Sequence, residues 1–389
     1  MINNYKLPLY ETIALGGMVL ALFLGAGNII FPPLVGMQAG VNTFDAGLGF
    51  IITAVLFPAL AIISVAINGG NIEELTKPLG KWPGLIFIGV CFLTLGIFYG
   101  TPRTATISFE VISDGKSSSV IQKIIFSGAF FGLTGATLAK PGKLLEIVGF
   151  FLSPLKISAL IFIGVCAWLH PIGELTTATA SYEVQAFRTG FVNGYQTLDV
   201  ISALCFGGII THTLRERGVN HSRDIFIHST AAAIIAAAGL TVIYICYMSM
   251  GSHSPIQGAT NGMQIMSNYV KTAFGVYGQV LLAAIITLAC LVTAIGLTTG
   301  TARYFNQTTG VSYGVMVTLS LMVSAALAVL GLNSLTEMAV PVLCAIYPAA
   351  LMVVALGIVR KWIEVPANLY QLLFYSALGV GILSLSVKS

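Results

Sequence analysis

The chain has 389 residues, of which 56% are hydrophobic and only 8% are Asp, Glu, Lys or Arg, and its formal net charge is +4. Soluble domains carry about a quarter charged residues, so this composition excludes a soluble enzyme, a disordered chain and a nucleic-acid binder. It also argues against a β-barrel, whose strands alternate apolar and polar residues. We therefore predict an all-α polytopic membrane protein.

Apolar stretches separated by polar or Gly/Pro breaks predict eleven transmembrane helices within a single domain, residues 1–389. Helices one to five (about 10–169) and six to ten (about 191–360) would be two inverted halves, and an extra helix would follow. Lys and Arg are concentrated in alternate loops, which predicts a cytoplasmic N-terminus. In chain order, the predicted helices are 10–36, 44–68, 83–110, 120–138, 143–169, 191–214, 223–249, 269–303, 312–331, 335–360 and 367–387.

The first predicted helix contains Gly25-Ala26-Gly27-Asn28, followed by Phe31-Pro32-Pro33. Two glycines and an amide in mid-span, with prolines after them, predict that the helix unwinds here. Freed N–H groups at the start of the second half could bind a carboxylate, and freed carbonyls at the end of the first half could bind a small cation. Close helix packing through small residues is the alternative interpretation of the glycines.

The sixth predicted helix repeats this pattern. Its start, Gly190 to Asp199, is rich in polar groups, and Ser202 to Gly208 provides a second flexible stretch. Interruptions in helices one and six are expected of a five-plus-five inverted repeat. The sequence therefore predicts discontinuous helices one and six that face each other across a central site.

Few charged residues lie inside or beside the predicted helices, and such residues are functional candidates. Arg103 and Glu110 are seven residues apart on helix three, Lys156 lies in helix five and Asp199 in helix six. For Arg103, Glu110 and Asp199 we predict a gating or structural role. In helix eight, the Thr293 hydroxyl could bind a hard cation, although threonines in apolar helices commonly bond to their own backbone.

Several short motifs follow one another along the chain, from helix one to helix ten. Together they resemble the signatures of the bacterial branched-chain amino acid carriers, a family of the amino acid–polyamine–cation superfamily. Members commonly have twelve helices, one more than we count here. The motifs are Phe23 to Pro33, Pro102 to Glu110, Pro141 to Leu145, Phe191 to Asp199, Ala289 to Leu297 and Pro341 to Pro348.

The resemblance implies a leucine-transporter-like fold and uptake of leucine, isoleucine and valine, coupled to Na⁺ by alternating access across the bacterial cytoplasmic membrane. It implies no enzymatic activity and no cofactor besides the coupling ion, with membrane lipid as the remaining partner and no nucleic acid. The alternatives are an H⁺-coupled or other neutral amino acid symporter of the same fold and, less favoured, a channel. A channel would need a continuous polar lining, whereas the polar groups here cluster at two breaks.

The resemblance also assigns roles to single residues. Val292 stands where similar cation sites often have Ser or Thr, which makes ligation of Na⁺ less complete. The Na⁺ ligands would be the carbonyls of Ala21, Leu24 and Ala289 and the hydroxyl of Thr293, with Asn28 beside them. The expected substrate-binding residues are Gly25, Ala26, Gly27, Tyr99, Ile201, Ser202 and Ala203.

Overall fold

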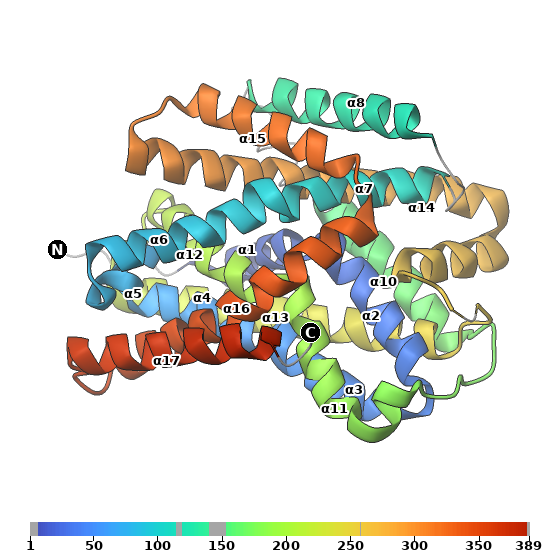
Figure 1. Ribbon diagram of the computed structural model, residues 1–389, viewed down its shortest axis with the longest axis horizontal. Coiled ribbons are helices and arrows are strands. Elements are labelled where there is room, and N and C mark those ends of the chain that lie inside the picture. The colour runs from blue at the N-terminus through green and yellow to red at the C-terminus, as the bar shows by residue number, and fades with distance from the viewer. Residues whose placement is uncertain (1–6, 114–118, 140–152, 257, 387–389) are drawn as a thin grey trace.

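The computed structural model describes residues 7–113, 119–139, 153–256 and 258–386, and every regular element within these ranges is a helix. Figure 1 shows how the helices are arranged in space. They are α1 (Leu9–Phe23), α2 (Ala26–Ala39), α3 (Thr43–Ile51), α4 (Phe57–Ile67), α5 (Ile72–Thr76), α6 (Lys81–Leu93), α7 (Gly100–Ser113), α8 (Val120–Leu138), α10 (Ser153–Leu169), α11 (Ala180–Gly194), α12 (Asp199–Glu216), α13 (Ser222–Ser252), α14 (Gly262–Thr309), α15 (Tyr313–Ala328), α16 (Leu332–Val359) and α17 (Ala367–Ser386).

Seven helical stretches in the described ranges are long and apolar enough to cross a membrane. The count is eight if α11 and α12, which meet at a 41° bend, form one span. Three more helices are apolar but shorter, namely α1, α15 and the Pro154–Leu169 part of α10. These findings confirm the predicted all-α polytopic membrane protein.

Most of the predicted helices correspond to one element or to two joined elements. The first is divided into α1 and α2, as predicted, and the second is α3 and α4 joined by the π-helical turn Ile52–Leu56. The eighth is longer than predicted, because α14 begins at Gly262 and bends at Gly275, whose φ is +66°. Of the fifth, residues 143–152 lie outside the described ranges.

The helices form two groups according to their contacts. The first group contains α1 and α2, α3 and α4, α11 and α12, and α13, which contact one another extensively. The second contains α7, α8, α14 and α15, of which α8 and α15 lie side by side along one edge of the molecule (Figure 1). Helices one, two, six and seven thus form one group and helices three, four, eight and nine the other, and the two groups meet directly where α14 packs against α2. This grouping is the one expected of two related halves of five helices.

Helix α10 connects the two groups, since it contacts α1 and α13 of the first and α14 of the second. A side chain on α10 can therefore reach the interruption between α1 and α2. Helix α16 likewise contacts α4 and α12 of one group and α7 of the other. These two helices each contact both groups.

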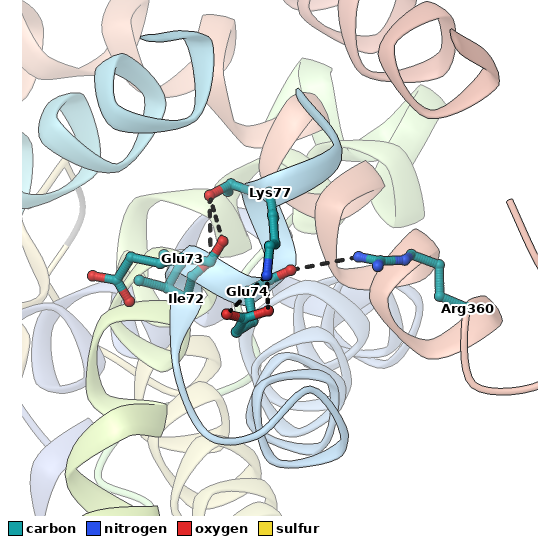
Figure 2. Close-up of polar contacts among 6 residues, drawn as sticks. Ile72, Glu73, Glu74, Lys77 and Arg360 are labelled. Atoms are coloured by element: carbon teal, nitrogen blue, oxygen red, sulfur yellow. Dashed lines mark hydrogen bonds and ion pairs between the residues drawn. The ribbon is translucent and has the colours of Figure 1, made fainter. Parts of the chain in front are cut away.

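Helix α17 packs along α16 and is fixed to the connection between α4 and α6. The Tyr370 hydroxyl donates to the Leu75 carbonyl at 2.8 Å. Figure 2 shows this connection, in which Lys77 pairs with Glu74 at 3.3 Å and Arg360, at the end of α16, donates to the Glu74 carbonyl. The Lys77–Glu74 pair is exposed, so it adds little stability compared with the buried contacts.

Glycines allow α2 and α13 to cross with their backbones in contact. A Cβ built on Gly251 would lie 1.9 Å from the Pro33 carbonyl oxygen, and one on Gly36 would lie 2.0 Å from that of Met248. No side chain fits at either position without separating the helices. Gly36 and Gly251 therefore serve close packing of α2 against α13.

Candidate transport site

The first interruption lies at Leu24 and Gly25, where the helix predicted from the sequence is broken. Leu24 has ψ +66° and Gly25 has an extended backbone, so the hydrogen-bond ladder stops and α2 begins anew at Ala26. The Gly25 N–H donates to the Phe23 carbonyl instead of continuing the ladder. Carbonyls at the end of α1 and N–H groups at the start of α2 thus have no partner in their own helix.

The N-terminus of α2 faces the guanidinium group of Arg103. A Cβ built on Gly27 would lie 2.7 Å from Arg103 Nη2, so a side chain at this position would displace the guanidinium end of Arg103. Helix α2 has no side-chain cap, and its first N–H groups carry the positive end of the helix dipole. Two sources of positive charge therefore meet at this point, which is the arrangement that a carboxylate ligand requires.

Arg103 is buried and is positioned by the start of α7. Tyr99, with φ −138°, interrupts the helix before α7, and its hydroxyl accepts from Arg103 Nη1 at 3.2 Å. The same nitrogen donates to the Gln196 carbonyl at 2.9 Å, and the guanidinium lies over the rings of Tyr99 and Phe31. Arg103 Nε has no hydrogen-bond partner among the described residues. Tyr99, which we expected to bind substrate, thus positions the side chain of Arg103, for which we predicted a gating or structural role.

The second interruption lies at Leu198, within the polar start Gly190 to Asp199 of the sixth predicted helix, and not in the flexible stretch predicted at 202–208. Leu198 has φ +69°, the only positive φ of a non-glycine residue in the described ranges, and α12 runs unbroken from Asp199. Ile201, Ser202 and Ala203, expected in the unwound turn, are buried in the first turns of α12 instead. The break thus lies about one helical turn before the expected position, toward the N-terminus.

Asp199 and Asn28 connect the two interruptions. The Asn28 amide donates to Asp199 Oδ2 at 2.6 Å, and the Tyr244 hydroxyl donates to the same oxygen at 3.2 Å. Asn28 also contacts the Tyr244 hydroxyl. In the structure the Asn28 side chain is therefore engaged with Asp199 and Tyr244, whereas the sequence placed it beside a cation. Tyr244, on α13, was not identified from the sequence, because a tyrosine in an apolar helix gives no signal by itself.

The carbonyls predicted to bind Na⁺ accept hydrogen bonds from a lysine. Lys156 Nζ donates to the Ala21 and Leu24 carbonyl oxygens, each at 2.9 Å. The other two predicted ligands bond to each other, since Thr293 Oγ1 donates to the Ala289 carbonyl at 3.0 Å. A threonine that bonds to its own helix backbone is the alternative interpretation of Thr293 given in the sequence analysis. Lys156 was recognised as a charge inside a helix, but no contact with helix one was predicted.

Glu110 lies away from the interruptions. The Asn261 amide donates to its carboxylate, and the pair lines a pocket of about 470 Å³ at the end of α7. Lys123 and Gln264 line the same pocket. Glu110 and Arg103 share a helix, as the spacing predicted, but their side chains contact different parts of the molecule. Glu110 therefore belongs to this pocket and Arg103 to the helix interruptions.

Comparisons with known proteins agree with this geometry. Two solved structures of the transporter Mhp1 share the fold. One, described as a nucleobase-cation-symport-1 family transporter in a closed conformation with bound bromovinylhydantoin, has a TM-score of 0.64 at 14% identity and covers 96% of this chain and 90% of its own. The other, inward-facing, has a TM-score of 0.61 at 12% identity and covers 99% and 94%. The chain therefore has the leucine-transporter-like fold, as predicted.

The model of a family described as branched-chain amino acid transport protein matches residues 9–389. The branched-chain amino acid permease BrnQ of Escherichia coli (strain K12) is 43% identical over 362 residues, covering 92% of this chain and 82% of that protein. The branched-chain amino acid transport system 3 carrier protein of Pseudomonas aeruginosa is 43% identical, covering 89% and 80%. The branched-chain amino acid permease BraB of Bacillus subtilis (strain 168) is 35% identical, covering 92% and 82%. The chain belongs to this family of membrane transport proteins, and it is not an enzyme.

Proposed function

We propose that this protein takes up leucine, isoleucine and valine across the bacterial cytoplasmic membrane by alternating access, driven by a cation gradient, with its N-terminus in the cytoplasm and membrane lipid around it. The observation that carries the proposal is the meeting of the α2 N-terminus with Arg103 at Gly27. The substrate carboxylate would bind there. The names of the relatives point to the same amino acids.

Alternating access is supported by the two groups of helices. Helix α2 belongs to the first group, and Arg103 is on α7 of the second, so a carboxylate between them would contact both groups. A substrate that binds both groups changes the relative stability of their arrangements, which is how a ligand biases a conformational equilibrium. Rocking of one group against the other would then expose the site to each side in turn.

The sequence predicts Na⁺ as the driving cation, with H⁺ as the alternative. The Na⁺ position would be at the end of α1, where carbonyls without a partner in their own helix and the negative end of the helix dipole favour a cation. In the structure two of the four proposed ligands, the Ala21 and Leu24 carbonyls, accept from Lys156. This observation favours the alternative over Na⁺ at this position.

The proposal is tested by competition for radiolabelled leucine uptake into proteoliposomes. One methylene changes binding in an apolar pocket by only about 1–3 kcal/mol, so isoleucine and valine should compete with leucine within roughly tenfold. Lysine and glutamate should not compete, because a second charge would enter an apolar pocket unpaired. Inhibition of leucine uptake by lysine as strong as that by isoleucine would refute the proposal.

A further inference from the structure

Lys156 carries a charge that is completely enclosed by the protein. Its side chain is only 1% exposed, and it reaches from α10 to the end of α1, more than a hundred residues earlier in the chain. Its Nζ donates to the Ala21 and Leu24 carbonyl oxygens at 2.9 Å each. A lysine ammonium has three N–H donors, and two of them are thus directed at helix one.

The end of α1 is a place where a positive charge is stabilised. The interruption at Gly25 leaves the last carbonyls of α1 without partners in their own helix, and these carbonyls form the negative end of the helix dipole. Burial of an unpaired charge is costly unless polar groups surround it. Lys156 and the end of α1 therefore compensate each other.

No carboxylate neutralises Lys156 in the part of the chain that the structure describes. The ion pairs found there are Lys77–Glu74, His212–Glu216 and Arg217–Glu11. The carbonyls of α1 are thus its direct polar contacts, as they would be for a bound metal cation.

The same atoms do not suit Na⁺ while Lys156 is present. Na⁺ would need the Ala21 and Leu24 carbonyls, which the ammonium occupies. On α14, Thr293 Oγ1 is directed to the Ala289 carbonyl, and the neighbouring Val292 contributes no side-chain oxygen. Two cations competing for the same two oxygens would also repel each other at short range.

We propose that the Lys156 ammonium is a built-in cation that takes the place of Na⁺ at the interruption of helix one, so that amino acid binding needs no sodium ion there. By bonding to both Ala21 and Leu24, it fixes the break from which α2 presents its N–H groups to the carboxylate. The ammonium group is covalently attached and cannot diffuse away, unlike a dissolved ion. This inference rests on the proposed uptake of amino acids and identifies what fills the cation position.

The inference is tested by measuring radiolabelled leucine binding to the purified protein in sodium chloride and in choline chloride. We expect the same affinity in both salts for the parent protein and for Thr293→Val, whose hydroxyl bonds only to its own helix among the described contacts. Lys156→Met keeps the length of the side chain and removes its charge. It should weaken leucine binding about tenfold or more, since two charge-assisted hydrogen bonds are lost. Lys81→Met, at an exposed lysine, is the matched control and should bind like the parent.

A tenfold or greater gain in leucine affinity of the parent on addition of Na⁺ would overturn the inference. A second measurement does not depend on leucine: the melting temperature of the parent should not rise saturably with Na⁺ compared with choline. A saturable rise would show a sodium site and would also overturn the inference. If the parent binds no leucine in either salt, the proposed substrate is wrong, and the melting measurement still decides whether Lys156 replaces Na⁺.

Discussion

Replacement of Gly27 by leucine is expected to abolish leucine binding while the protein remains folded. A Cβ at this position would lie 2.7 Å from Arg103 Nη2, and a leucine side chain would extend further into the space where α2 meets α7. The substrate carboxylate would be displaced from the N–H groups of α2, and Arg103 would be pushed from Tyr99. We expect binding to weaken more than about a hundredfold, because several charge-assisted hydrogen bonds are lost together.

Binding of radiolabelled leucine to monodisperse protein in detergent measures this effect. Gly17→Leu is the matched control, since Gly17 lies in α1 and a Cβ there would have no atom within 4 Å. It should bind leucine like the parent. Near-normal binding by Gly27→Leu would show that the carboxylate does not bind at the start of α2.

Replacement of Gly251 by valine is expected to have the largest effect on stability. The added Cβ would lie 1.9 Å from the Pro33 carbonyl oxygen, and backbone cannot move aside as a flexible side chain can. Overpacking of a core typically costs about 1–3 kcal/mol, and separation of α2 from α13 should cost at least the upper part of that range. We expect a markedly lower melting temperature and little monodisperse protein.

Gly132→Val in α8 is the control for this substitution, because Gly132 is exposed in a helix and a Cβ there has no atom within 4 Å. It includes the modest gain of helix propensity that replacement of a helical glycine by valine brings at any such position, because glycine is the poorer helix former. Melting of the purified variants, followed by fluorescence, compares the two. Equal melting temperatures for Gly251→Val and Gly132→Val would mean that α2 and α13 are not in backbone contact.

Composition and helix-breaking residues were sufficient to predict the fold class and the first interruption. Two glycines and an asparagine in the middle of an apolar helix favour an interruption there. The structure divides the helix at Leu24 and Gly25. The second interruption could not be placed in the same way. It lies at Leu198, a residue type that rarely adopts positive φ, whereas the glycines of 202–208 are accommodated within a regular helix.

The partners of the charged residues could not be predicted, because they lie on helices that are distant in the sequence. Lys156 was recognisable as a charge within an apolar helix, but only the packing of α10 against α1 directs it to Ala21 and Leu24. Asn28 was recognisable as a costly amide, but its partner Asp199 is 171 residues away. A single sequence indicates that such groups need partners and does not identify them.

The most direct test of the central claim is counterflow of radiolabelled leucine in proteoliposomes that contain the purified protein. A site that alternates between the two sides exchanges one bound amino acid for another. Liposomes loaded with unlabelled leucine, isoleucine or valine should therefore accumulate external labelled leucine transiently, whereas liposomes loaded with lysine should not. Equal accumulation of label whatever amino acid is inside would contradict alternating access and indicate a passive pore instead.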